Sequence, residues 1–415
     1  MATVNTRRVV VTGGGIVSTL GNNWEEALKN LKAGKNFVRY MSEWDGIYPL
    51  LNTRLAAPLD NFKLDPEKYP RKKIRGMGPV AQLSLASTDR ALECAGLKEG
   101  DPIFTSGRMG IAFGSSSGSI MPLMDFYAML ITHDTSKLGA TTYVKCMPQT
   151  CAANLEVYYQ LKGRIIVTDT ACTSGSQAIG YAYEAIKFGL QDVMIAGGAD
   201  EFTPVNTAVF DTLFSTSTKN QTPELSPSAY DKNRDGLVVG EASSTLILEE
   251  YEHAKARGAK IYAELVGFGS TTDGTHITSP NRDTIANAIR LAIDDAGIDS
   301  KEIGYVNTHG TATVAGDVCE SGATYDVFQR SVPVSTTKSY TGHTLGACGA
   351  LEAWVTINMM NEGWFHPNLN LKEVDPECAP LDYITGNGRE IKTDYVMSNN
   401  FAFGGVNTSL IFKRV

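Results

Sequence analysis

Short runs of aliphatic and β-branched residues alternate with segments of helical periodicity along this chain. The strand-like runs cover 9–12, 109–113, 165–168, 193–196 and 245–248, and a second set covers 262–267, 304–307, 332–335, 396–398 and 409–412. Between them, apolar residues recur at helical spacing, for example in 79–95, 284–296 and 349–360. Strands that alternate with helices predict an α/β fold with largely parallel sheets.

The two sets of strands divide the chain into two halves, 1–255 and 256–415. In each half, the residues suited to chemistry follow a strand directly, in a turn rich in Gly, Ser and Thr. Open α/β sheets bind ligands at the carboxyl ends of their strands. We therefore expect two similar α/β domains, with the functional residues at these strand ends.

The composition argues against several classes of function. A net charge of −8 is unfavourable for a general nucleic-acid or anionic-membrane binder. The seven cysteines lack the paired spacing of zinc sites or disulfide frameworks, which predicts reduced thiols and a cytoplasmic protein. No apolar run approaches the roughly 20 residues of a membrane span, and the N-terminus shows no apolar signal core.

Cys172 is the first candidate for chemistry. A β-branched run at 164–168 leads into a turn of small residues that contains Cys172, and a helical pattern follows at 177–188. Unpaired N–H groups and the positive end of a helix dipole lower a cysteine pKa from about 8.5 toward neutral and favour the nucleophilic thiolate. The alternative is a buried, inert cysteine, which is common in proteins.

Two histidines occupy similar positions in the second half. His309 follows the strand-like run 304–307, and His343 follows the run 332–335 and precedes a helical pattern. Taken singly, each histidine fits a structural role. Two of only six histidines at strand ends, together with Cys172, instead predict one catalytic site.

The segments around these three residues, together with 399–405, resemble the β-ketoacyl-[acyl-carrier-protein] synthases of the Cys-His-His type. The resemblance covers essentially the whole chain. It implies a thiolase-like fold, with two similar α/β halves in a five-layered α-β-α-β-α arrangement. It also implies a decarboxylative Claisen condensation of an acyl-enzyme with malonyl-carrier protein, without a cofactor. Within the family, 174–180, 339–354 and 398–403 resemble the ketosynthase of bacterial aryl polyene clusters.

The resemblance also implies roles for individual residues. Cys172 takes the acyl group, while the backbone N–H groups of Cys172 and Phe403 form the oxyanion hole. His309 and His343 stabilise the enolate as neutral N–H donors. Lys338 and the helix after His343 disfavour their charged forms.

Several supporting groups follow from the same comparison. A buried Lys338 needs a partner, for which Glu352 and Glu320 are both candidates. A structural monovalent cation is expected near the group Asn307, Glu352, Ser398 and Asn399. Phe403 resembles the family's gate, although this chain has Ala402 where relatives commonly carry glycine.

The acyl pocket and the partner surfaces complete the expectations. Ser117 and Phe401 are assigned to the acyl pocket, where a small Ser117 would leave room for a long acyl chain. The basic residues Arg71, Lys72 and Arg75 are expected to dock an acidic acyl carrier protein. The segment 143–154 resembles the stretch that closes a partner's pocket, so a homodimer or a heterodimer with a related subunit is expected.

Other interpretations are weaker. A CoA-primed synthase typically has Asn in place of His343, and a non-catalytic chain-length subunit would lack Cys172. The segment 231–236 begins like a calcium loop, but Ala242 stands where the bidentate ligand belongs. Ser18 likewise replaces the third glycine of a dinucleotide-binding turn at 13–18.

Overall fold

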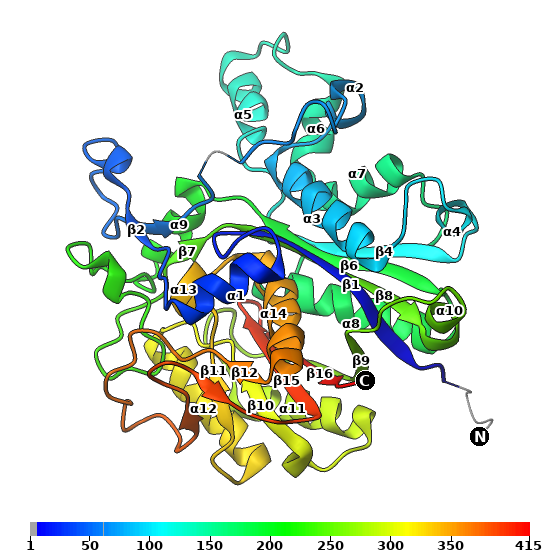
Figure 1. Cartoon of the computed structure of the whole chain (residues 1–415). Helices are drawn as coiled ribbons and strands as arrows, with labels where there is room; N and C mark the ends of the chain where they lie inside the picture. The colour runs from blue at the N-terminus through cyan, green and yellow to red at the C-terminus, as the bar shows by residue number, and fades with distance from the viewer. Residues whose placement is uncertain (1–5, 61) are drawn as a thin grey trace.

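The main sheet of the protein has eleven strands. The computed structural model describes residues 6–60 and 62–415. From one edge to the other, the strands are β13 (Asp382–Tyr383), β11 (Pro333–Ser335), β10 (Ile303–Asn307), β15 (Tyr395–Ala402), β16 (Val406–Lys413), β9 (Ala263–Thr272), β1 (Val9–Ser18), β8 (Ala242–Glu250), β6 (Val193–Asp200), β4 (Met109–Gly114) and β5 (Ile165–Val167). Both predicted sets of strands are therefore present (Figure 1).

The order of strand pairing is the same in both halves of this sheet. From β1 through β8, β6 and β4 to β5, the pairs are antiparallel, antiparallel, parallel and parallel. From β9 through β16, β15 and β10 to β11, the same series recurs. Only a three-residue pairing of β1 with β9 joins the two sets. This repetition supports the proposed division at 255 and 256, which stays a prediction.

The expectation of largely parallel sheets is wrong in part, because each half contains antiparallel pairs. In the second half, β15 and β16 are joined by the three residues 403–405. A connection this short permits only an antiparallel pair, because a parallel crossover needs a dozen residues or more.

Fourteen α-helices lie in the described part of the chain. They are α1 (Trp24–Lys32), α2 (Arg71–Ile74), α3 (Pro79–Ala95), α4 (Pro102–Thr105), α5 (Leu123–Thr132), α6 (Ala140–Cys146), α7 (Thr150–Tyr159), α8 (Ser174–Lys187), α9 (Pro204–Asp211), α10 (Tyr251–Ala256), α11 (Arg282–Ala296), α12 (Val314–Phe328), α13 (Lys338–Thr341) and α14 (Cys348–Glu362). None of these helices is long and apolar enough to cross a membrane.

The helices and strands form five layers. Helices α3 and α7 pack on the β1 half of the sheet, and α11 packs on β9 and β16 with α12 beside it. Helices α8 and α14 contact each other and strands of both halves, so they form the middle layer (Figure 1). Every residue of α14 from Cys348 to Met360 is buried, as expected of a helix that is enclosed on all sides. The predicted thiolase-like α-β-α-β-α fold is confirmed.

The first turns of α8 and α14 meet backbone to backbone. A Cβ built on Gly349 would lie 2.5 Å from the backbone nitrogen of Ser176, and one on Gly175 would lie 2.9 Å from that of Ala350. Only glycine permits this approach. The contact fixes the distance between the turn before α8 and the turn before α14.

We predict that Gly349→Ala destabilises the protein, because the new methyl group overlaps the backbone of α8. Overpacking of this kind costs about 1–3 kcal/mol, which would appear as a lower midpoint of thermal unfolding. Gly76→Ala is the matched control, since its new Cβ would meet its nearest neighbour at 3.6 Å. Equal midpoints for the two variants would show that the helix contact is not tight.

Candidate active site

Cys172 lies in a strained turn between β5 and α8. The turn is the short 3₁₀ segment η2 (Ala171–Thr173), and Ala171 has φ of 49°, in a region that non-glycine residues rarely adopt. A similar turn, η5 (Leu345–Ala347), precedes α14, and Leu345 has φ of 52°. Backbone strain of this kind collects at functional sites, where the surrounding structure over-determines the geometry.

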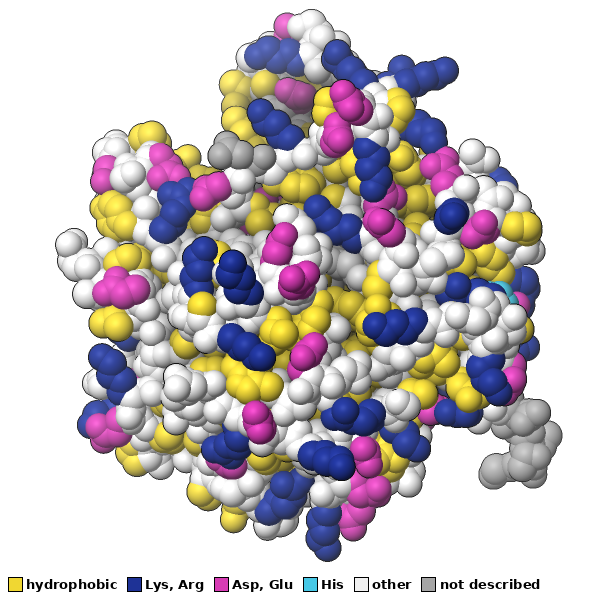
Figure 2. Space-filling view, viewed as in Figure 1, with side chains coloured by type: hydrophobic (Ala, Val, Ile, Leu, Met, Phe, Trp, Pro, Cys, Tyr) yellow, Lys and Arg dark blue, Asp and Glu magenta, His cyan; other side chains and the backbone are white. Residues whose placement is uncertain are grey.

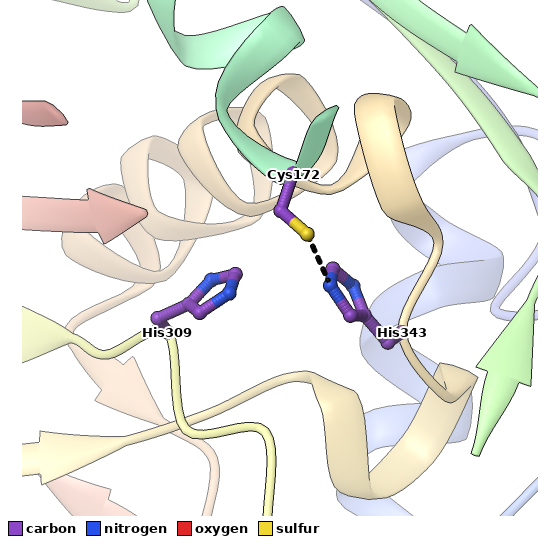
Figure 3. Close-up of side chains that lie close together, drawn as sticks. All are labelled: Cys172, His309 and His343. Carbon is purple, nitrogen blue, oxygen red and sulfur yellow. Dashed lines mark hydrogen bonds between the residues drawn. The ribbon is translucent and has the colours of Figure 1, made fainter. Parts of the chain in front are cut away.

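The two histidines converge on the cysteine from the second half of the chain. His309 follows β10, and His343 lies between α13 and η5. His343 Nε2 is 2.9 Å from Cys172 Sγ (Figure 3). The cysteine sulfur and one ring nitrogen of each histidine all lie within 4.8 Å of one another. The imidazole rings are nearly perpendicular, with centroids 5.2 Å apart. The structure thus brings together the three side chains that the sequence singles out.

The hydrogen bonds identify which ring nitrogen carries the proton. The backbone N–H of Leu345 donates to His343 Nδ1 at 3.3 Å, so the proton of a neutral ring is on Nε2. Asn400 Nδ2 faces His309 Nδ1 at 3.4 Å, and its bond to a Glu352 oxygen at 2.7 Å marks it as the donor. His309 therefore also carries its proton on Nε2. Both rings present N–H donors on the cysteine side.

The same hydrogen bonds distinguish this site from a metal centre. A metal-binding histidine usually donates its outer N–H to an acceptor and turns a lone pair to the metal. Here both outer Nδ1 atoms accept a hydrogen bond instead. The arrangement therefore fits an anionic oxygen near Cys172 better than a cation.

Burial keeps both imidazoles neutral. Desolvation lowers the pKa of His309 and of His343 well below the ordinary value, and the charge of Lys338 lowers both further. Protonation of either ring would place a second positive charge beside Lys338 in a dry interior. The expectation of neutral N–H donors agrees with this electrostatic setting.

The expected low pKa of Cys172 is wrong for the unliganded site. Burial raises the pKa of its thiol to about 12, although Lys338 and the backbone N–H groups of Cys172 and Phe403 oppose the shift. The side chain is almost completely enclosed, so loss of solvation outweighs the helix end that the sequence argument invoked. The resting residue is a thiol surrounded by groups that stabilise its anion.

Lys338 pairs with Glu352 rather than with Glu320. Its Nζ lies 2.5 Å from Glu352 Oε1, and both side chains are buried. Asn400 and Thr337 donate to the same carboxylate. Glu320 instead accepts the backbone N–H groups of His309 at 2.7 Å and Gly310 at 2.8 Å. Glu352 therefore binds Lys338, while Glu320 fixes the turn that carries His309.

The three residues open into a cavity of about 210 Å³. Phe401 and Phe403 both line it, and Phe403 packs on Phe210 with ring centroids 5.5 Å apart. The left-handed backbone of the adjoining turn falls on Gly404 and Gly405. Ala402 is paired within the β15–β16 ladder, so its Cβ does not conflict with the backbone of this turn.

Ser117 does not line this cavity. The residue is exposed in the single chain, in the turn after β4, where its hydroxyl lies 3.5 Å from the Gly118 carbonyl oxygen. The sequence argument placed it by likeness to relatives, and the strand end turns it outward here. Its assignment to the acyl pocket stays a prediction.

The basic residues expected to dock a carrier lie at and just beyond α2. Arg71, Lys72 and Arg75 are exposed, and none forms an ion pair with another described residue. Figure 2 shows Lys and Arg side chains gathered around this helix at the top of the molecule. The cluster is free to meet an acidic partner.

Three residues that the sequence argument did not assign also shape the site. Asp200, at the end of β6, accepts the backbone N–H of Gly346 at 2.6 Å and so anchors the turn after His343. Cys348 Sγ donates to the carbonyl oxygen of Cys172 at 3.2 Å. Asn400 links His309 to Glu352. Two sequence signals could have identified them: Asp200 stands at the end of a strand, and Asn400 belongs to the motif at 399–405.

The proposed cation site has some suitable donors. The side-chain oxygens of Asn307 and Asn399 are buried without a hydrogen-bond partner in the described chain, and neutral oxygens of this kind suit a hard cation. Ser398 accepts a hydrogen bond from Asn307 Nδ2 at 3.4 Å. Glu352 is already bonded to Lys338 and Asn400. A structural monovalent cation near Asn307, Glu352, Ser398 and Asn399 therefore stays a prediction.

Comparison with known proteins gives consistent matches over the chain. Family models described as beta-ketoacyl synthase, N-terminal domain and C-terminal domain match residues 6–254 and 262–372. A 3-oxoacyl-[acyl-carrier-protein] synthase 2 of Vibrio cholerae is 39% identical, covering 99% of each chain. A crystal structure of a beta-ketoacyl synthase from Burkholderia phymatum has 56% identity and a TM-score of 0.96, covering 99% of this chain and 100% of that one. The ishigamide ketosynthase/chain length factor has 30% identity and a TM-score of 0.88, with 99% and 100% covered.

We predict that removing the charge of Lys338 makes Cys172 less reactive. In the double variant Lys338→Met with Glu352→Gln, no unpaired carboxylate is left buried, and the thiol pKa rises because the attracting cation is gone. Alkylation of Cys172 by iodoacetamide at pH 8 should slow about tenfold, the effect of one pKa unit. Mass spectrometry of the labelled peptide measures the rate.

The control for this experiment is Lys187→Met, which breaks a lysine–aspartate pair on the far end of α8. Circular dichroism of each variant checks that the fold is retained. An unchanged alkylation rate in the folded double variant would contradict the electrostatic role of Lys338.

Proposed function

The chain belongs to the β-ketoacyl synthase family, and we propose that Cys172 is the nucleophile with which it carries out decarboxylative Claisen condensation. An acyl group passes from a carrier-protein thioester to the cysteine. A malonyl thioester then loses CO2, and its enolate attacks the acyl-enzyme. The observation that carries the assignment of residues is the convergence of Cys172, His309 and His343, with both imidazoles presenting Nε2–H groups.

In the acyl-transfer step, Cys172 Sγ attacks the thioester carbonyl carbon and the carrier thiol leaves with the proton. The developing oxyanion accepts hydrogen bonds from the backbone N–H groups of Cys172 and Phe403, which in the resting site face the sulfur. Removing one such donor typically lowers a rate by about 10²- to 10³-fold. Burial raises the pKa of the resting thiol, so the thiol proton has to be removed for Sγ to attack.

In the condensation step, the carboxylate of the malonyl group leaves as CO2 and its bonding electrons form an enolate. His309 and His343 donate their Nε2–H groups to the enolate oxygen and do not have to surrender a proton. Their low pKa values keep them neutral, so the developing charge resides on substrate oxygen. The enolate carbon then attacks the acyl carbonyl carbon, the C–S bond to Cys172 breaks, and the released thiolate takes up a proton from water.

We also propose a docking site for the carrier protein and a gate to the cavity. Arg71, Lys72 and Arg75 would attract an acidic acyl carrier protein, which is the carrier named for the Vibrio cholerae relative. The rings of Phe403 and Phe210 both line the cavity and pack on each other, so displacement of Phe403 would widen access to Cys172. A cytoplasmic location stays a prediction.

The pathway is a finer proposal than the reaction. The local segments 174–180, 339–354 and 398–403 favour aryl polyene or related polyketide synthesis. The full-length similarity to a 3-oxoacyl-[acyl-carrier-protein] synthase favours fatty-acid synthesis. A purely structural chain-length subunit is disfavoured because Cys172 and both histidines are present and converge.

Two features of the chain, helix α5 and strand β5, support an oligomer. Every residue of α5 is at least partly exposed, although the helix carries the large apolar residues Met124, Tyr127, Leu130 and Ile131. Strand β5 lies at the edge of the sheet, with its outer side unpaired in the described chain. Large apolar patches and free sheet edges are typical of subunit interfaces. A second copy or a related ketosynthase-like subunit would cover both.

We predict that Leu130→Asp with Ile131→Asp converts a dimer into a monomer, because the new carboxylates would be buried at the interface without partners. Phe188→Asp, at an exposed apolar residue after α8, is the control. Analytical ultracentrifugation measures the mass. A dimer that survives the double substitution would place the interface elsewhere.

We predict that Cys172→Ala abolishes the covalent acyl adduct but retains decarboxylation of the malonyl thioester, because the histidine donors remain in place. Intact-protein mass spectrometry detects the adduct, and release of labelled CO2 detects decarboxylation. Cys348→Ala should still form the adduct, since that sulfur faces the backbone rather than the cavity. An acyl adduct of normal yield on the Cys172 variant would refute the assignment.

A further inference from the structure

Cys348 is a buried thiol that has no role in the proposed mechanism. It is the first residue of α14 and is 1% exposed. Its Sγ donates to the carbonyl oxygen of Cys172 at 3.2 Å and accepts from Asn400 Nδ2 at 3.6 Å. None of the other five cysteines forms a hydrogen bond with Cys172 in the part of the chain that the structure describes. A second thiol therefore adjoins the residue that carries the nucleophile.

The backbones of two helices hold these cysteines close together. Cys172 lies in η2, directly before α8, and Cys348 begins α14. Gly175 and Gly349 keep the first turns of the two helices in backbone contact. Each of the two sulfurs also lies within 4.8 Å of a ring nitrogen of His309. A disulfide needs Cα atoms roughly 4.4–6.8 Å apart, a spacing that helix turns in backbone contact can meet.

The two thiols differ in their access to small molecules. Cys172 lines the cavity of about 210 Å³, whereas Cys348 does not line it in the described chain. A small oxidant that enters the cavity therefore reaches the sulfur of Cys172 first. Cys348 contacts the same residue from the packed interior. An accessible reactive cysteine beside a resolving cysteine is common at sites of reversible oxidation.

One ammonium group favours the thiolate form of both cysteines. Burial raises the pKa of the Cys172 thiol and of the Cys348 thiol, and in each case the charge of Lys338 is the largest influence that opposes burial. A thiolate formed at either sulfur is therefore stabilised by the same cation. Thiolates are the reactive species both in oxidation and in disulfide formation.

We propose that Cys172 and Cys348 form a reversible disulfide when hydrogen peroxide enters the cavity. In the first step, Sγ of Cys172 attacks one oxygen of the peroxide, the O–O bond breaks, and the products are a sulfenic acid on Cys172 and water. In the second step, Sγ of Cys348 attacks the oxidised sulfur, the S–O bond breaks, and the hydroxyl group leaves as water with the thiol proton. The two thiols lose two electrons, and one peroxide is reduced to two molecules of water.

The disulfide would protect the nucleophile while it stops acylation. In the resting site Cys172 Sγ faces His343, so its side chain has to turn toward Cys348 before the S–S bond forms. A sulfenic acid without a resolving thiol is oxidised further to sulfinic acid, which ordinary thiols do not reduce, whereas a dithiol reduces a disulfide. The inference goes beyond the proposed function. No step of its test uses an acyl substrate, so a failure of condensation leaves the result unchanged.

The test compares the reduced wild-type protein with Cys348→Ala after treatment with a molar excess of hydrogen peroxide. Each protein is digested with trypsin without reduction, and the peptides are analysed by mass spectrometry. The tryptic peptides 165–187 and 339–372 each contain one cysteine, so a cross-link between them identifies the pair Cys172 and Cys348. The wild type should yield this cross-linked peptide with the loss of two hydrogen atoms. Cys348→Ala should instead gain two oxygen atoms on Cys172, the mass of sulfinic acid.

Reversal by dithiothreitol is the second measurement. After peroxide treatment and reduction, iodoacetamide labelling of Cys172 should return in the wild type and should stay lost in Cys348→Ala. Cys378→Ala is the matched control, because it removes another buried cysteine that does not line the cavity, and it should behave like the wild type. Each labelling rate is compared with that of the same protein before oxidation, and circular dichroism checks that each variant is folded.

A second variant, Cys348→Ser, keeps the size of the side chain and its hydroxyl donor but has no sulfur to form the cross-link. It should lose labelling irreversibly, as Cys348→Ala does. A wild-type protein that gains oxygen on Cys172 without the cross-linked peptide would overturn the proposal. A disulfide from Cys172 to a different cysteine, or equal recovery of labelling in the wild type and both Cys348 variants, would also overturn it.

Discussion

The contact between the first turns of α8 and α14 is the constraint on which the site depends. Gly175 and Gly349 let the two backbones approach more closely than any side chain permits. The turn before α8 carries Cys172, and the turn before α14 follows His343. Two regions that are 171 residues apart therefore place a sulfur and an imidazole nitrogen at 2.9 Å. The pairing of five strands in the same order in each half supplies the frame for this contact.

The buried ammonium group of Lys338 sets the electrostatics around that contact. Lys338 lowers the pKa of both histidines and opposes the burial that raises the pKa of Cys172. Its charge is balanced by Glu352, whose second oxygen accepts from Asn400. Since Asn400 also donates to His309, the ion pair sets both the charge state and the tautomer of a ring. The polar interior is thus one connected network.

The sequence carried enough information for the α/β fold and for the convergence of Cys172, His309 and His343, because strand periodicity and strand-end motifs are local signals. It did not predict the antiparallel pairs, which depend on the length of connections in space, nor the raised pKa of Cys172, which depends on complete burial. The position of Ser117 outside the cavity could not be predicted from the sequence, because the direction of a side chain after a strand is decided by tertiary packing. The choice of Glu352 over Glu320 as the partner of Lys338 likewise required coordinates.

Phe403, in the turn after β15, contributes both its backbone N–H and its ring to the site. The N–H of Phe403 faces the sulfur, and the ring of the same residue lines the cavity and packs on Phe210. If the proposed gate opens by a movement of the backbone between β15 and the glycines Gly404 and Gly405, the N–H of Phe403 moves with the ring. Under the proposed function, entry of the second substrate would then withdraw a donor from the first oxyanion.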